Sequence, residues 1–211
     1  MRSVVFLMPL IFHSLFSLGQ YPGYSLLGNT ESFREIIKKT TSATESIQSD
    51  FSQEKTMTML SEKIFSSGRF WFKKSNRLRM EYIKPYSYLI ILNDSKIYIK
   101  DDQHENKVST HSNKIFQQVN GILLDCMSGT MLENQDFRSR IFEGKNAFLI
   151  EFTPVAKNLK ELYKNINIVV DKKDYSASSV EMVENAGNKT IIRFQNKVIN
   201  APIPDAVFNI P

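Results

Sequence analysis

The sequence contains few of the residues that support covalent or metal chemistry. Of its 211 residues, one is cysteine, Cys126, and three are histidine. One cysteine excludes an intrachain disulfide bond, and we interpret Cys126 as a buried structural thiol on a helix. His104 and His111 lie in a polar segment without a Ser-His-Asp order, a metal-ligand cluster or a glycine-rich phosphate loop. The sequence therefore predicts no catalytic residue, no metal and no cofactor. An enzyme that uses these three side chains is the first alternative.

Long runs of positive charge are also absent. The chain has 27 Lys and Arg residues against 22 Asp and Glu residues, and no basic run is longer than two residues. This excess is too small and too dispersed for a nucleic-acid-binding protein. It favours weak attraction to acidic partners or to anionic headgroups.

The one long apolar stretch lies at the N-terminus and is too short to cross a bilayer. Arg2 precedes a mainly apolar run at residues 4–16, whereas a membrane-spanning helix needs about 20 apolar residues. A basic start, an apolar core and small residues before a break at Gly19 are typical of a secretory signal peptide. We therefore expect residues 1–19 to be removed and residues 20–211 to form a single exported domain.

The rest of the chain mainly alternates apolar and polar residues with the period of β-strands. The clearest segments are residues 70–72, 78–82, 148–152, 166–170 and 192–194. Turn residues such as Asn, Asp, Gly and Pro separate them at short intervals, which suits consecutive antiparallel strands. The sequence therefore predicts a mainly β protein.

Three segments break this alternation. Residues 32–35, Ser-Phe-Arg-Glu, have the spacing of a capping box with Ser32 as the cap, and they predict a helix over residues 32–44. Apolar residues at intervals of three and four predict a second helix over residues 112–125. Residues 155–162 follow a proline, and we interpret them as a short helix or a crossing loop.

Large, deformable side chains are concentrated on the face that a curled sheet would turn inward. A sheet of about ten strands must curl, and its inner face must be filled or hold a ligand. Phe51, Phe70, Phe72, Met80 and Tyr82 are candidates for this face. Met adapts to irregular apolar partners, and aromatic rings provide large contact areas. Composition alone leaves both a filled barrel and a ligand cavity open.

Four motifs, in order along the chain, resemble those of the LolA family of lipoprotein carriers. Residues 47–53 are similar to its first strand, in which a small residue, Phe, a hydroxyl residue and Gln follow an apolar residue. Residues 68–82 resemble a hairpin of the pattern Gly-x-apolar-Trp-x-Lys-basic-Pro-Asn that leads into an aromatic strand. Residues 93–99 are similar to an Asp-Gly-Lys hairpin, and residues 204–211 to a Phe-x-apolar-Pro ending. The likeness covers residues 32–211.

The resemblance implies an incomplete, unclosed antiparallel β-barrel of about eleven strands with a lid of short α-helices. Its concave face would bind the acyl chains of lipoproteins and carry them across the periplasm without catalysis. An inner-membrane ABC transporter would load the carrier, and an outer-membrane acceptor would unload it. We expect the carrier to be a monomer.

The resemblance and the periodicity together assign residues to the cavity and its lid. The cavity would be lined by Ile47, Phe51, Phe70, Phe72, Leu78, Met80 and Tyr82. The lid would present Ile115, Phe116, Val119, Ile122 and Leu123 on one helical face. Because neighbours in a strand face opposite sides, Trp71 and Arg79 should point away from the cavity.

Lys74 is the candidate for a lid latch. In the family, a basic residue two positions before the hairpin Asn, usually Arg, holds the lid shut. Here Lys74 occupies that position, and Ser75 replaces the usual Pro. Arg offers a planar fork of donors whereas Lys offers a rotating point charge, so a Lys latch should be less directional. A solvated charge at a strand end is the alternative interpretation.

Two further functions remain open. Envelope-stress sensors use a LolA-like domain to detect mislocalised lipid, but they join it to a second domain for which this chain is too short. A carrier of the same fold could instead take a glycolipid or another acyl ester. The residues do not choose between these cargoes.

Overall fold

The computed structural model describes residues 21–94, 96–101, 105–109 and 114–211. The expected signal peptide and both histidines of the polar segment, His104 and His111, lie outside the described residues. The side chains of Ile115, Phe116 and Val119 also lie outside the described part, although the backbone there is helical.

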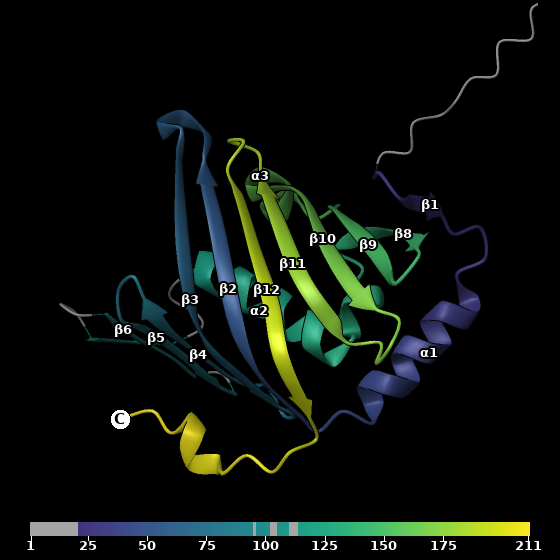
Figure 1. Ribbon diagram of the computed structural model, residues 1–211. Helices are drawn as coiled ribbons and strands as arrows, with labels where there is room; N and C mark the ends of the chain where they lie inside the picture. The colour runs from purple at the N-terminus through teal and green to yellow at the C-terminus, as the bar shows by residue number, and fades with distance from the viewer. Residues whose placement is uncertain (1–20, 95, 102–104, 110–113) are drawn as a thin grey trace, which may run out of the picture.

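Within the described residues, twelve strands form one antiparallel sheet that is open at both ends (Figure 1). The strands are β1 (Tyr24–Leu26), β2 (Ser46–Met57), β3 (Glu62–Lys73), β4 (Arg77–Lys84), β5 (Tyr88–Asn93), β6 (Lys96–Asp101), β7 (Glu105–Ser109), β8 (Phe137–Gly144), β9 (Ala147–Pro154), β10 (Tyr163–Asp171), β11 (Ala177–Glu184) and β12 (Lys189–Ile199). Their order across the sheet is β1-β8-β9-β10-β11-β12-β2-β3-β4-β5-β6-β7. Because β1 and β7 are its edges, the barrel is unclosed, and the predicted fold class is confirmed.

Two meanders build this sheet. The strands β2 to β7 form the first and β8 to β12 the second, and the two join where β12 pairs with β2. All five segments with predicted strand alternation lie in strands. Their period of two follows from a sheet that has a different environment on each face.

The helices connect distant parts of the sheet. They are α1 (Glu31–Ser42), α2 (Lys114–Ser128) and α3 (Lys157–Leu162), and short 3-10 turns lie at η1 (Thr58–Leu60), η2 (Thr130–Leu132) and η3 (Asp205–Phe208). In the chain, α1 leads from the edge strand β1 to the central strand β2, and α2 leads from the other edge, β7, to β8. Both therefore cross the sheet. No helix in the described part is long and apolar enough to cross a membrane.

The helix over residues 32–44 was predicted correctly, but its start was not. We expected Ser32 to be the N-cap, whereas α1 begins at Glu31 after Thr30, and no side chain caps it at that position. Instead, the amide of Glu31 donates a hydrogen bond to Asn29 Oδ1 at 2.9 Å. An Asx turn just before the helix thus satisfies a free N–H group of its first turn.

The main apolar cluster fills the concave face of the sheet beneath the two long helices. Phe33 and Ile37 enter it from α1, and Ile122 and Leu123 enter it from α2. Alternate side chains of the strands face them across the cluster. Figure 1 shows the sheet curled around α2 on this side. We call this group of residues the concave cluster.

A second, smaller cluster lies on the outer face of β3 to β6. The chain beyond β12 folds back there, and Ile203 and Phe208 pack with Ile91 and Tyr98. Trp71 packs against this cluster, and the Arg79 guanidinium lies 5.7 Å from the centre of the Trp71 ring. The prediction that Trp71 and Arg79 point away from the concave face is therefore confirmed.

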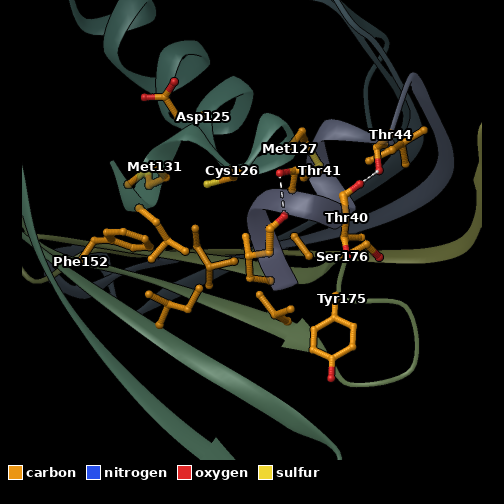
Figure 2. A pocket seen from close by; sticks show the side chains of 18 residues that line it. Thr40, Thr41, Thr44, Asp125, Cys126, Met127, Met131, Phe152, Tyr175 and Ser176 are labelled. Atoms are coloured by element: carbon orange, nitrogen blue, oxygen red, sulfur yellow. Dashed lines mark hydrogen bonds between the residues drawn. The ribbon is translucent and has the colours of Figure 1, made fainter. Parts of the chain in front are cut away.

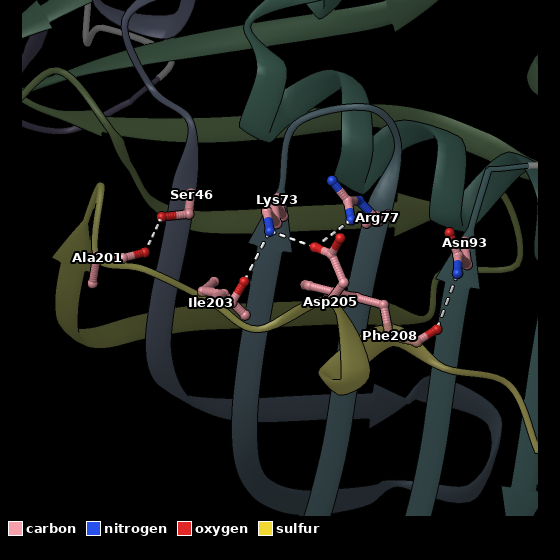
Figure 3. Close-up of polar contacts among 8 residues, drawn as sticks. All are labelled: Ser46, Lys73, Arg77, Asn93, Ala201, Ile203, Asp205 and Phe208. Carbon is pink, nitrogen blue, oxygen red and sulfur yellow. Dashed lines mark hydrogen bonds and ion pairs between the residues drawn. The ribbon is translucent and has the colours of Figure 1, made fainter.

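Polar contacts hold the C-terminal segment on this outer face (Figure 3). Lys73 Nζ donates to the carbonyl of Ile203 at 2.8 Å and pairs with Asp205, which also accepts from Arg77 Nη1 at 2.7 Å. The hydrogen bond from Lys73 and the charge of Arg77 hold the pKa of Asp205 below its usual value. Asn93 Nδ2 donates to the carbonyl of Phe208 at 3.2 Å. This anchor covers the outer face of β3 to β6.

Candidate functional site

All seven residues predicted to line a cavity lie on the concave face. Six of them are buried: Ile47, Phe51, Phe70, Phe72, Leu78 and Met80. The seventh, Tyr82, is partly buried and packs against the others. The sheet register explains the grouping, since Phe70 pairs with Met80 and Phe72 with Leu78 across β3 and β4.

This surface offers little to a polar ligand. Among the described residues, Ser49 Oγ is the one buried side-chain polar atom without a hydrogen-bond partner. Ser49 lies between Ile47 and Phe51 on β2, and it pairs with Phe70 across to β3. A buried hydroxyl without a partner costs about 1–3 kcal/mol. A ligand carbonyl that reached it would remove that cost.

A small cavity lies under the helices, and Figure 2 shows side chains that line it. Its volume is about 30 Å³, and residues of α1, α2 and strands β9 to β11 line it. A cavity of that volume holds about two water molecules and is far too small for an acyl chain. The sequence led us to expect an open cavity. In this structure the side chains of the two helices fill it instead.

Threonines and a cysteine line the rim of this cavity. Thr41 Oγ1 and Thr44 Oγ1 donate to carbonyls one turn earlier in α1, at 2.7 and 2.9 Å, so neither hydroxyl disturbs the apolar interior. Cys126 also lines it, and burial raises the pKa of its thiol well above the usual value. The residue as a whole is partly exposed, and a thiol with a raised pKa is a poor nucleophile. Within the described residues, no group of three His, Cys, Asp or Glu side chains could hold a metal ion.

An open groove of about 450 Å³ continues the concave face beyond the helices, at the ends of β2 to β6. The residues that line it are Gln53, Ile64, Ser66, Tyr82, Pro85, Tyr86, Ser87, Tyr88 and Asp101. Sequence reasoning assigned only Tyr82 of this set to the site. The aromatic spacing of Tyr82, Tyr86 and Tyr88 was the signal that could have indicated it.

Tyr82 lies between the groove and the concave cluster. Its ring contacts Phe51 edge to face at 4.9 Å and Tyr88 at 5.7 Å. The Tyr82 hydroxyl donates to Gln53 Oε1 at 3.0 Å. Burial raises the pKa of Tyr82 far above its usual value, so the hydroxyl remains a neutral donor at any physiological pH. A chain that passed from the groove to the buried cluster would have to move this ring.

The cover over the concave face comes from two helices, of which the sequence indicated one. Ile122 and Leu123 of the predicted lid are buried in the concave cluster, with Met127 beside them. Phe33 and Ile37 of α1 are buried there as well, and the Phe33 ring lies 4.5 Å from that of Phe148. The cover of the concave face is therefore formed by α1 and α2 together.

Among the described residues, Lys74 contacts the end of α1. Its ammonium donates to the carbonyl of Ser42, the last residue of α1, and to Glu45 Oε1 at 2.7 Å. A cation at a helix C-terminus is favourable because carbonyls there lack partners. Ser75, next in the hairpin, has φ of 69°, which proline is unable to adopt. The turn therefore differs from the Pro-containing turn of the family pattern.

Replacing Lys74 by leucine should loosen the end of α1 with little loss of stability. Both partners of its ion pair are largely exposed, at 42 % for Lys74 and 68 % for Glu45, so the pair contributes less than about 1 kcal/mol. If Lys74 acts as a latch, we expect the rate of release of a fluorescent acyl probe to rise by up to about fivefold, and to change more than the rate of loading. Lys189→Leu is the matched control, because Lys189 is 43 % exposed and pairs with Glu181 within the sheet. Equal rates in both variants would make Lys74 an ordinary surface charge.

One known protein family matches most of this chain. A family model described as outer membrane lipoprotein carrier protein LolA matches residues 42–211. A search of curated protein sequences finds no match.

Several solved structures share the fold. One is an uncharacterized conserved protein from Thermus thermophilus, with 8 % identity and a TM-score of 0.53, which covers 87 % of this chain and 95 % of that one. Another is MucB in the Pseudomonas aeruginosa MucA/MucB complex, with 13 % identity and a TM-score of 0.50, covering 85 % and 60 %. A LolA superfamily protein from Nitrosomonas europaea matches with 9 % identity and a TM-score of 0.48, covering 87 % and 99 %. At these identities the likeness concerns the fold alone.

Proposed function

The chain belongs to the LolA family of outer membrane lipoprotein carrier proteins, and from this premise we propose that it carries the acyl chains of lipoproteins between its concave face and the helices α1 and α2. Proteins of this family are carriers and not enzymes. The proposed route runs through the periplasm, from the inner to the outer membrane. The proposed partners are an ABC transporter at the inner membrane and an acceptor at the outer membrane. We also propose that residues 1–19 direct export and are then removed.

The observation that carries this proposal is the apolar layer between an open sheet and two crossing helices. Each lipid methylene left in water costs about 0.8 kcal/mol, so a multiply acylated lipoprotein needs an apolar container to cross an aqueous compartment. The concave cluster contains Phe51, Phe70, Phe72 and Met80 on strands that the helices cover. Flexible Met and flat aromatic side chains adapt to a chain of irregular shape.

The closed cavity requires that the helices move when cargo binds. A volume of about 30 Å³ leaves no room for an acyl chain, so a bound chain would take the place of Phe33, Ile37, Ile122 and Leu123 against the sheet. Apolar contacts are then exchanged for apolar contacts, and the equilibrium between closed and open forms shifts by the difference in affinity alone.

The polar attachments of α1 lie at the two sides of this layer. Arg34 donates to the carbonyl of Leu132 at 3.0 Å and to Ser139 Oγ at 2.8 Å, and Lys74 holds the other end at Ser42. When these hydrogen bonds break, their donors and acceptors can bond to water instead. The free energy needed to move the helices away from the sheet therefore remains small. In the open form, Ser49 would be available to donate to an ester carbonyl of the cargo.

The test is to identify what the exported protein carries. The protein purified from the host envelope should release acylated protein or its lipid on denaturation, as detected by mass spectrometry. The emptied protein should bind a fluorescent acyl probe, lose it to competing lipoprotein, and leave the probe chemically intact. A co-purified glycolipid would instead assign the second kind of cargo. Time-dependent cleavage of the probe, abolished by Cys126→Ala or by a histidine variant, would overturn the carrier proposal.

A further inference from the structure

Large apolar side chains are exposed at the end of the sheet where the groove opens. The last pair between β3 and β4 is Ser67 with Lys84, so the residues of β3 from Glu62 to Ser66 have no partner on that side. Phe65 in this segment is 64 % exposed. In the turn from β4 to β5, Tyr86 is 76 % exposed and lines the groove together with Ile64. Monomeric proteins rarely expose such groups together without a partner for them.

A fixed hairpin tip extends this apolar surface. Met59, in the η1 turn between β2 and β3, is 91 % exposed. The preceding residue, Thr58, donates through its hydroxyl to the carbonyl of Gly187 at 2.6 Å, and its amide donates to Asn188 Oδ1 at 3.2 Å. The tip is therefore tied to the β11–β12 turn, which lies next to it in Figure 1. We call Met59, Ile64, Phe65, Ile83 and Tyr86 the apolar end.

The apolar end adjoins the groove. Ile64 and Tyr86 belong to both, and the groove leads to Tyr82 and so to the concave cluster. A lipid that reached the groove would meet Ile64 and Tyr86 first and then Tyr82 at the edge of the concave cluster.

Cations flank the apolar end. Lys55 and Lys84 form no ion pair with any described residue, and Lys84 lines a shallow depression with Phe65 and Arg193. Glu54 in the same depression is already paired with Lys63 at 2.9 Å and with Arg193 at 3.8 Å. Glu62 at the start of β3 is a second acid, so the four cations Lys55, Lys63, Lys84 and Arg193 exceed the two acids by two. Each basic residue near an anionic bilayer contributes about 1 kcal/mol of attraction.

We propose that the apolar end is a docking surface for an anionic lipid bilayer, with Met59, Phe65 and Tyr86 inserted at the level of the headgroups. Tyr suits this position because its ring is apolar and its hydroxyl reaches water. Docking in this orientation opens the groove directly to the acyl chains of the membrane. The inference rests on the proposed carrier function and adds a membrane contact made by the carrier itself.

The test measures binding to lipid vesicles by the protein after residues 1–19 are removed, so that their apolar stretch does not contribute. Binding should be detectable on vesicles with about a third of phosphatidylglycerol in phosphatidylcholine, and several-fold weaker on pure phosphatidylcholine or at high salt. The double variant Met59→Ser with Phe65→Ser should bind about tenfold less tightly or worse. Leu26→Ser is the matched control, because Leu26 is 63 % exposed on the far edge strand β1 and should not insert.

Three results would overturn the docking surface. The first is that the wild-type protein does not bind the anionic vesicles, and the second is that Leu26→Ser loses as much vesicle binding as the double variant. The third is that the wild-type protein is a dimer in solution and the double variant is a monomer. The last would assign the apolar end to a second copy of the chain. Met59 and Phe65 do not line the groove, so the double variant should bind an acyl probe normally without vesicles. Failure of vesicle binding with intact probe binding rejects the docking alone, whereas a wild-type protein that binds no probe rejects the carrier function.

Discussion

Replacing Phe70 by alanine should lower the free energy of unfolding by about 3–5 kcal/mol and weaken binding of an acyl probe by about tenfold. Phe70 is fully buried at the centre of the concave cluster, and its ring lies 5.0 Å from that of Phe194. The loss of stability follows from the removed apolar area and the void that remains. The loss of affinity follows because a chain that lies against β3 would lose its aromatic contact.

Phe208→Ala is the control that separates the two effects. Phe208 is equally buried, but it belongs to the C-terminal segment and packs in the cluster on the outer face. Its truncation should cost about the same in stability and leave probe affinity unchanged. Chemical denaturation and fluorescence titration measure the two quantities, and the milder pair Phe70→Leu and Phe208→Leu serves if the alanine variants unfold. Equal changes in affinity for both sites would mean that the concave face has no special part in binding.

Gly68→Ala should be one of the most destabilising substitutions in this chain, at about 3 kcal/mol or more. A Cβ atom on Gly68 would lie 2.0 Å from the carbonyl oxygen of Glu81 and 2.9 Å from the Phe51 ring. Backbone is unable to yield as a flexible side chain does, so the bulge between β3 and β4 at this position would have to break. Gly68 is also the first residue of the hairpin motif that indicated the family. The structure supplies a steric reason for glycine there.

The companion substitution Gly121→Ala should instead raise the free energy of unfolding. Gly121 lies within α2, and a Cβ atom there would meet nothing within 4 Å. Alanine in a helix interior is more favourable than glycine by about 0.5–1 kcal/mol. Thermal unfolding of the two variants beside the wild type measures both effects. A Gly68→Ala protein as stable as the wild type would contradict the close approach of β3 and β4.

Much of the sheet was predictable because a strand repeats every two residues. Phe70 and Phe72 had to share a face, and Trp71 had to take the other. Once one face is apolar and covered, a shift of one residue would expose every buried side chain, so the pattern also sets the register. The β5 segment, Tyr88–Asn93, is apolar without alternation because both of its faces are buried, one under the helices and one under the C-terminal segment. The sequence alone does not show that both faces of β5 are covered.

The helix positions were predictable in part. The spacing of Ile122 and Leu123 indicated a covered face on α2, and both side chains are buried. The start of α1 was misassigned because Ser32 and Asn29 are both good capping residues. Local sequence does not decide between caps whose energies differ by a few tenths of a kcal/mol, about the spread among Asn, Ser and Asp caps.

By itself, the sequence determined the mainly β fold, the family and the faces of the central strands, because these depend on local periodicity and on motifs of adjacent residues. Only the tertiary structure decided which elements meet. It showed that α1 and α2 both cover the concave face, that Lys74 binds the end of α1, and that Tyr82 lies between the groove and the buried layer. It also showed a cavity closed to about 30 Å³. Each of these depends on contacts between residues far apart in the chain, and on how completely side chains fill a shared volume.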